Sequence, residues 1–333
     1  MLGTTVSVIQ KPSGNGAMPL ILIHDGGGTC FSYRLLGQLG RAVYTIENPR
    51  FQSGRPWKGG IQEMAEVYVE LIRCMRSKGT LPTESFLLGG WSLGGLISLQ
   101  IAKLLEGDDE LRVAGILMID SVFPATQEQM ERAPQPICAN IPDSKTSWPA
   151  ETRVAVLRSF KQTAAMLQLW TPPTWDDSTS TSLSSGSTTP SSEADFWDSS
   201  SSTSDSGFLR EISSIGSSSP IESKDDPKNF AAQLDARFQS YLGPSSSTTR
   251  PATVLLRASE VAPAPAGTMC RVDLHRDDRD LGWQEFERHF FNRVVDIPGH
   301  HFNLFVPQNV GVLTDELKDA CHLINSKWTE LHG

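Results

Sequence analysis

Runs of consecutive apolar residues alternate, over the first 120 residues, with segments whose apolar residues recur every three or four positions. A continuous apolar run is typical of a strand buried on both faces, and the wider spacing is typical of a helix with one buried face. The pattern predicts strands at 20–23, 42–46, 85–90 and 113–119 and helices at 62–76 and 96–105. This alternation is the order expected of a parallel sheet.

The alternation stops after residue 122, where several prolines precede a helical pattern, and it returns near the carboxyl terminus. The later part of the chain is predicted to form helices at 151–170, 229–242 and 309–328 and strands at 253–256 and 293–297. The last helix carries apolar residues at spacings of three and four, so we expect it to cover one flank of the sheet. We find no internal repeat.

A serine- and threonine-rich segment interrupts this second part of the chain. Ser and Thr make up 19 of the 29 residues from 178 to 206, too polar a composition to offset the entropy lost on ordering. We therefore predict disorder over 174–226, within a helical cap that spans 122–250. Residues 1–121 and 251–333 are expected to form the core.

Composition narrows the classes of function. The chain has 333 residues and a net charge of −9, and no cluster of Lys and Arg could neutralise a run of phosphates, so we expect no nucleic-acid partner. The five cysteines are widely spaced and form no C-x-x-C pair, which indicates neither a metal site nor a redox centre. We find no secretory signal and no apolar stretch long enough for a membrane helix, and therefore expect a cytoplasmic protein.

The first candidate for chemistry is Ser92, in the sequence Gly90-Trp91-Ser92-Leu93-Gly94 between a predicted strand and a predicted helix. G-x-S-x-G permits a tight passage from strand to helix that holds a serine hydroxyl clear of the sheet, as in the nucleophile turn of α/β-hydrolases. The alternative is a glycine turn with a spectator serine. Because strand and helix both flank the motif, we favour a nucleophile.

A serine nucleophile needs hydrogen-bond donors for the oxyanion that develops during acyl transfer. The N–H of Leu93, at the amino terminus of the helix, is one candidate donor. The second is expected in the glycine loop that follows the first predicted strand, with Gly26 preferred and Gly27 next. The alternative is a loop that only turns the chain.

The general base should be a histidine in the loop after the last strand, where the chain offers His300 and His301. We favour His301, because the apolar residues that follow it can anchor its loop, and expect His300 to point away. His24 is expected to brace the glycine loop. The remaining histidines are expected to face solvent: His275, His289, His322 and His332.

Two acids could orient this histidine. Asp120 follows the strand after the nucleophile helix, and Glu260 follows the next predicted strand, where a generic α/β-hydrolase places its acid. Both strand ends face the same edge of a parallel sheet. Spacing alone leaves the choice open.

These motifs resemble the thioesterase domains that release products from polyketide and nonribosomal peptide synthases, particularly fungal ones. The resemblance covers most of residues 19–325, except the Ser-rich insertion. It is carried by segments similar to that family's oxyanion loop, nucleophile turn, acid strand and histidine loop: Leu20 to Gly28, Gly89 to Gly95, Ile119 to Ser121 and Ile297 to Phe302. Each motif is modest alone, and the four in this order are fairly specific.

The resemblance implies an α/β-hydrolase fold, a mostly parallel sheet with helices on both faces, and a helical lid that matches residues 122–250. The Ser-rich insertion departs from a compact lid. The family's acid lies where Asp120 stands here, which leaves Glu260 as the fallback. By the same resemblance, Ser92 attacks and His301 moves the proton.

The resemblance also implies the substrate class. Such enzymes take an acyl chain from the phosphopantetheine arm of an acyl or peptidyl carrier protein and release it by hydrolysis or cyclisation, with no metal or cofactor. The chain contains no serine in a plausible carrier-domain motif, so the carrier is expected to act in trans or to lie outside this sequence.

Two other functions are considered. A carboxylester hydrolase or lipase acting on a free ester would suit the glycine loop His24-Asp25-Gly26-Gly27-Gly28, which faintly resembles the HGGG loop of esterases. A non-catalytic scaffold that binds a carrier would suit the Ser-rich segment. Turnover of thioesters against oxygen esters separates the first from a thioesterase, and loss of acyl transfer on Ser92→Ala excludes the second.

Overall fold

The computed structural model describes most of the chain outside the Ser-rich region. The described residues are 5–11, 17–126, 129, 136–137, 148–175 and 250–332. The helix predicted at 229–242 and all but the first two residues of the segment predicted to be disordered lie outside them.

Seven strands form one mixed sheet in the order β1-β3-β2-β4-β5-β7-β9. Every neighbouring pair in it is parallel except β1 and β3. The strands are β1 (Val6–Gln10), β2 (Leu20–Ile23), β3 (Val43–Ile46), β4 (Ser85–Trp91), β5 (Arg112–Ile119), β7 (Ala252–Ala258) and β9 (Arg293–Ile297). The mostly parallel sheet is confirmed. Strand β1 was not predicted, because its alternation of polar and apolar residues is short and is broken where Val8 and Ile9 are adjacent.

In the described part of the chain, four longer helices accompany the sheet: α1 (Gly60–Ser77), α2 (Leu93–Leu104), α4 (Ala150–Leu169) and α6 (Val310–His332). Short elements are η1 (Ser32–Leu35), η2 (Arg271–Asp273), η3 (Trp283–Glu285) and a small parallel pair, β6 (Pro136–Ile137) with β8 (Met269–Cys270). Across the described residues, none of the helices combines the length and apolar character that crossing a bilayer requires.

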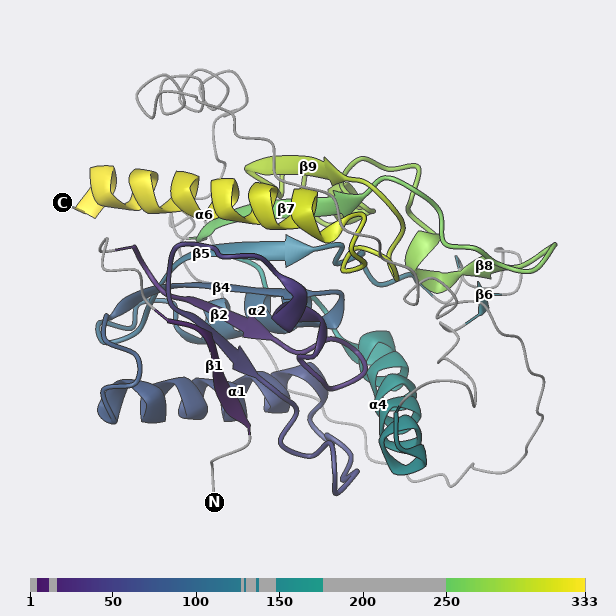
Figure 1. The fold of residues 1–333 in the computed structure, drawn as a ribbon, viewed down its shortest axis with the longest axis horizontal. Coiled ribbons are helices and arrows are strands. Elements are labelled where there is room, and N and C mark those ends of the chain that lie inside the picture. Colours follow the sequence, from purple (N-terminus) through teal and green to yellow (C-terminus); the bar gives the residue numbers. More distant parts are fainter. Residues whose placement is uncertain are drawn as a thin grey trace, which may run out of the picture.

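Helices cover both faces of the sheet (Figure 1). On one face α1 and α2 pack against the apolar cluster that contains Leu88 and Met118, and on the other α6 packs against the cluster that contains Leu87 and Leu117. Neighbouring residues of a strand point to opposite faces, so a strand with both faces covered must be apolar throughout. This explains the continuous apolar runs and confirms the predicted α/β architecture.

Helix α4 lies beyond the end of the sheet to which β4 and β5 point (Figure 1). It contacts the loop after β2, where Thr163 Oγ1 donates a hydrogen bond of 3.1 Å to the carbonyl oxygen of Gly26. Trp175, within the range predicted to be disordered, is instead buried in the core cluster with α1 and α2. The division into a core and a cap stays a prediction.

Candidate active site

Ser92 sits in a strained turn between β4 and α2. Its φ of 56° and ψ of −119° lie outside the regions that an L-residue favours, as expected of a serine held at a nucleophile turn. Two hydrogen bonds fix this backbone: the Ser92 N–H donates to the Ile119 carbonyl at 2.8 Å, and Ser121 Oγ donates to the Ser92 carbonyl at 2.7 Å. The turn is therefore tied to the end of β5.

The glycines on either side of Ser92 are needed because the backbone crowds there. A Cβ on Gly90 would lie 2.5 Å from the carbonyl carbon of Gly94 and 2.8 Å from the carbonyl oxygen of Ile23. A Cβ on Gly94 would lie 2.8 Å from the carbonyl oxygen of His24. Hydrogen alone fits at both positions, so the spacing of G-x-S-x-G has a steric cause here.

His301 is paired with Asp120 by a hydrogen bond of 2.7 Å from His301 Nδ1 to Asp120 Oδ2. Asp120 directly follows β5 and has a φ of 46°, and its N–H donates to the Leu256 carbonyl of β7 at 2.7 Å. The His301 ring packs between aromatic neighbours, with ring centroids 5.3 Å from Trp91 and 4.9 Å from Phe302. The structure thus brings together the favoured histidine and the favoured acid.

The sequence did not predict the second hydrogen-bonding partner of the Asp120 carboxylate. Arg276, in the segment between β8 and β9, donates from Nη1 to Asp120 Oδ1 at 2.7 Å and from Nη2 to Asp120 Oδ2 at 2.8 Å. The two side chains are 4% and 0% exposed, so this bidentate pair is shielded from water. A forked guanidinium holds a carboxylate at a defined angle as well as a defined distance.

All five N–H donors of Arg276 are used. Besides the two donated to Asp120, Nε donates to Asp273 Oδ1 at 3.0 Å, and the remaining two donate to the carbonyls of Ala258 and Val272. A buried charge with complete pairing is stable in a low-dielectric surrounding, whereas an incomplete set would be costly. Arg276 is therefore locked in place around Asp120.

Burial by itself would raise the pKa of Asp120, but the hydrogen bonds and charges of His301 and Arg276 outweigh it and lower the pKa to about 2. A fourth hydrogen bond, from the N–H of Ala258 to Asp120 Oδ1 at 2.8 Å, acts on the same carboxylate. Asp120 is ionised at neutral pH, so its carboxylate can only accept a hydrogen bond. The Nδ1 atom of His301 must therefore carry the hydrogen that it donates to Asp120. This fixes the His301 tautomer with Nε2 free to take up a proton.

The glycine loop after β2 presents one suitable N–H. The N–H of Gly27 is taken by Asp25 Oδ1 at 2.8 Å, and that of Gly28 by the Asp25 carbonyl at 3.0 Å. Among the described residues, no acceptor faces the N–H groups of Gly26 or Leu93, and both residues line the same pocket as Ser92. The geometry thus favours Gly26 over Gly27 as the partner of Leu93.

His24 stabilises this loop through its two ring nitrogens. Its Nδ1 donates to the Asp25 carbonyl at 2.6 Å, so its Nε2 accepts from the Tyr68 hydroxyl at 2.6 Å. Burial lowers the pKa of His24 to about 4, despite the hydrogen bond to Asp25, and keeps the ring neutral. Burial raises the pKa of Asp25 to about 6, partly offset by its hydrogen bonds from the loop N–H groups.

The other sequence candidates lie elsewhere. Glu260 is exposed, and its N–H donates to the Gly299 carbonyl, while the carboxylate makes no contact with His301. His300 is partly buried, which lowers its pKa, and its Nδ1 accepts from the Phe302 N–H at 3.3 Å. The expectation that His275 faces solvent is wrong: it is buried, packed against Gly282 in the folded segment before β9.

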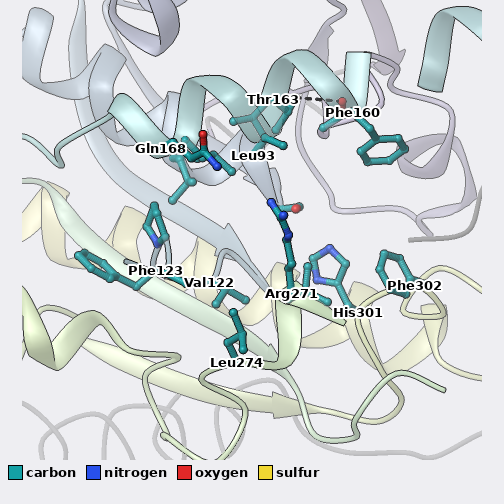
Figure 2. A pocket seen from close by; sticks show the side chains of 18 residues that line it. Leu93, Val122, Phe123, Phe160, Thr163, Gln168, Arg271, Leu274, His301 and Phe302 are labelled. Carbon is teal, nitrogen blue, oxygen red and sulfur yellow. Dashed lines mark hydrogen bonds between the residues drawn. The ribbon is translucent and has the colours of Figure 1, made fainter. Parts of the chain in front are cut away.

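One pocket collects these groups (Figure 2). Ser92, Leu93, Gly26 and His301 line it together. Its other walls are mostly apolar and come from α2, from α4, from the chain after β5 and from the segment around η2: Leu96, Val122, Phe123, Phe160, Ala164, Leu167 and Leu274. Such a cavity can take up an acyl chain and keep water from a reacting carbonyl.

Sequence reasoning missed Arg276 and Asp273, which lie in the charged run 271–280. Seven of these ten residues are Arg or Asp, and a run of alternating charges is ordinarily a solvated surface. No spacing rule connects Arg276 to Asp120, which is 156 residues away. Only the fold brings the two side chains together.

The chain is similar to known thioesterases. The family described as "Thioesterase domain" matches residues 18–161. The chain is 32% identical over 308 residues to the probable thioesterase gloN of Glarea lozoyensis, covering 91% of this chain and 89% of that protein. It is also 29% identical to part of the nonribosomal peptide synthetase imqB of Aspergillus flavus, covering 97% of this chain and 8% of that protein.

Among solved structures, the chain is similar to the NocB thioesterase domain, determined as a covalent complex with a fluorophosphonate nocardicin G analog. The TM-score is 0.51 with 18% sequence identity, over 95% of this chain and 98% of that chain. At this identity the similarity shows the fold alone. It confirms the arrangement of sheet and helices described above.

Proposed function

Since this chain belongs to the thioesterase family, we propose that it releases an acyl chain from a phosphopantetheine thioester on a carrier protein, by way of an ester of Ser92. The observation that carries the proposal is the hydrogen bond of 2.7 Å between His301 Nδ1 and Asp120 Oδ2, in a pocket that Ser92 and His301 share. A nucleophile, a base and an orienting acid are the parts that acyl transfer requires.

In the first half of the proposed reaction, Ser92 Oγ attacks the thioester carbonyl carbon and its proton passes to His301 Nε2. Asp120 holds the ring in the required tautomer and stabilises the imidazolium that forms. The tetrahedral intermediate then collapses: the carbon–sulfur bond breaks, and the thiol leaves with the proton from His301. The acyl group remains as an ester on Ser92.

The oxyanion of the intermediate would be bound by the N–H groups of Gly26 and Leu93. Both lack an acceptor among the described residues, and Leu93 begins α2, whose amino-terminal dipole favours negative charge. Each such donor commonly contributes about 100-fold or more to kcat. The free N–H groups therefore support acyl transfer over simple acyl binding.

In the second half, a nucleophile attacks the ester carbonyl carbon while His301 removes the nucleophile's proton; the bond to Ser92 Oγ then breaks, and His301 returns this proton to Ser92 Oγ. Water gives hydrolysis, and a hydroxyl, amine or carbon nucleophile of the acyl chain gives a ring. The likeness to part of a nonribosomal peptide synthetase supports a carrier-bound acyl group as the substrate. We accordingly place the enzyme in polyketide or nonribosomal peptide biosynthesis, with an acyl or peptidyl carrier protein as its partner.

The test compares one acyl group presented three ways: as a thioester of a phosphopantetheinylated carrier, as a thioester of N-acetylcysteamine and as the matched oxygen ester. We expect the highest kcat/KM with the carrier, and Ser92→Ala to reduce it by roughly 10⁶-fold. Ser53→Ala, in an exposed loop, serves as the matched control and should retain full activity. Equal rates on thioester and oxygen ester would instead favour a carboxylester hydrolase, and undiminished turnover by Ser92→Ala would exclude the triad.

A further inference from the structure

A second arginine, Arg271 at the start of η2, lies in the pocket itself rather than behind it. It lines the cavity together with Ser92 and His301. Figure 2 shows its side chain rising from the η2 segment into the cavity, beside His301 and toward α4. Its Nε is buried, and no hydrogen-bond acceptor among the described residues faces it.

Among the described residues that line this cavity, Arg271 is the one permanently charged side chain. This described lining includes no carboxylate; its other polar side chains are those of Ser92, Thr163, Gln168 and His301. A cation against apolar walls is costly unless an anion or a strong acceptor meets it. The cavity is thus apolar along its walls and cationic at one place.

The neighbouring Arg276 shows what a structural arginine looks like in this segment. Its five N–H groups are all bonded to protein acceptors and its side chain is 4% exposed. For Arg271 no side-chain hydrogen bond or ion pair is formed with the described residues. A role in holding the fold explains Arg276 and leaves Arg271 unexplained.

We propose that Arg271 binds an oxyanion carried by the acyl chain, so that the enzyme selects acyl groups with an apolar body and a carboxylate. This inference rests on the function proposed above and names its substrate class. A guanidinium matches a carboxylate by two parallel hydrogen bonds, which strengthen where water is excluded. The phosphate of a phosphopantetheine arm lies at the opposite end from the thioester, so with the thioester carbonyl at Ser92 it does not reach a residue beside His301.

The test uses N-acetylcysteamine monothioesters of glutaric, adipic and pimelic acids, each paired with the substrate whose free carboxylate is replaced by carboxamide. At the best chain length we expect kcat/KM for the acid to exceed that for the amide on the order of 10- to 100-fold. Arg271→Gln should bring this ratio to about one. Arg271→Glu should reverse selectivity toward an acyl chain that ends in an ammonium group, which a merely structural role would not produce.

Arg288→Gln is the matched control, since it removes the same charge from an exposed position outside the pocket. It should leave the acid-to-amide ratio as in the parent enzyme. An unchanged ratio in Arg271→Gln, or no preference for the acid at any chain length, would overturn the inference. So would a dependence on Arg271 that appears only with phosphopantetheine thioesters, because the bound anion would then be the phosphate.

A second readout separates this inference from the proposed function. Thioether analogues of the same acid and amide cannot transfer an acyl group, and their binding is measured by calorimetry with the parent protein and with Arg271→Gln. Tighter binding of the acid that depends on Arg271 supports the inference even if no thioester is turned over. Equal binding of acid and amide contradicts it even if Ser92 proves to be the nucleophile.

Discussion

Arg276 donates hydrogen bonds to both carboxylate oxygens of Asp120, at 2.7 and 2.8 Å, and shares one of them, Oδ2, with His301. Together with the N–H of Ala258, the carboxylate therefore has three hydrogen-bonding partners around it and almost no freedom to rotate. Asp120 thus presents Oδ2 to His301 in one orientation, set by a fully bonded arginine. We regard Arg276 as a positioning residue that acts on the reaction through Asp120.

Replacing Arg276 should lower kcat much more than it changes KM. Arg276→Lys keeps the charge but loses the fork, so we expect kcat to fall about 10- to 100-fold, and Arg276→Met to fall further. Removing one partner of a buried pair costs about 3–5 kcal/mol of stability, so thermal unfolding must accompany the kinetics. A folded Arg276→Lys enzyme with unchanged kcat would contradict the positioning role.

The same variant has a pH signature. Arg276 helps to hold the pKa of Asp120 down at about 2, so the stability contributed by this carboxylate is present above its unfolded value of 3.8 and lost as pH falls through 2. Weakening the pair raises the folded pKa, so the loss should be smaller and should be complete at a higher pH. Acid unfolding followed by circular dichroism measures this shift.

Asp120 and Glu260 should differ sharply on substitution. Asp120→Asn keeps the shape but removes the charge that orients His301, so we expect roughly a 10,000-fold fall in kcat, by analogy with a serine protease triad. Glu260 is exposed and makes no contact with His301, so Glu260→Gln should stay within about twofold of the parent. Similar effects of the two substitutions would mean that the acid has been misassigned.

Gly94→Ala should destabilise the fold at the nucleophile turn. The added methyl group would press on the carbonyl oxygens of Ile23 and His24 at the end of β2, and backbone cannot move aside as a flexible side chain can. We expect a loss of about 3 kcal/mol in the free energy of unfolding. Gly311→Ala is the control, because nothing lies within 4 Å of its Cβ position in α6, and it should not destabilise.

His24 and Asp25 should have opposing effects on stability between pH 6.5 and pH 4. The lowered pKa of His24, about 4, makes its contribution fall as pH drops through this range. The raised pKa of Asp25, about 6, gives a contribution that is present below 3.8 and lost as pH rises through 6, so it grows on acidification. The two changes largely cancel in the parent protein.

Asp25→Asn removes the titrating carboxylate whose contribution to stability offsets that of His24. Between pH 6.5 and pH 4 the variant should lose about 2 kcal/mol more stability than the parent, as measured by urea unfolding. Asp109→Asn, at an exposed position, should follow the parent. If the stability of Asp25→Asn also changes with pH as the parent's does, Asp25 does not titrate as described.

The sequence predicted the parallel sheet and its helices because continuous apolar runs report burial on both faces, as in Leu87 and Leu88 of β4. It also predicted Ser92, Asp120 and His301 as candidates, because each follows a strand at the same edge of such a sheet. Spacing could not choose between Asp120 and Glu260, since either strand end could deliver an acid. In the structure His301 donates its hydrogen bond to Asp120, and this contact distinguishes Asp120 from Glu260.

Other parts of the site were beyond local reasoning. Arg276 reaches Asp120 only through the folding of a charged run that resembles ordinary surface, and His275 is buried by the same folding. The sequence already preferred Gly26 to Gly27, but the reason that the structure gives, the hydrogen bond from the Gly27 N–H to the Asp25 carboxylate, was not predicted. Such details depend on side-chain hydrogen bonds across the fold, which periodicity does not report.

Detection of an acyl group on Ser92 is the most direct test of the proposed mechanism. Intact-protein mass spectrometry after brief incubation with a panel of acyl thioesters should show the mass of one acyl group added to the parent protein. Peptide mapping should place it on Ser92, and Ser92→Ala should gain no mass. Thioester turnover with the acyl group on another residue, or with Ser92→Ala as active as the parent, would contradict the assignment of Ser92 as the nucleophile.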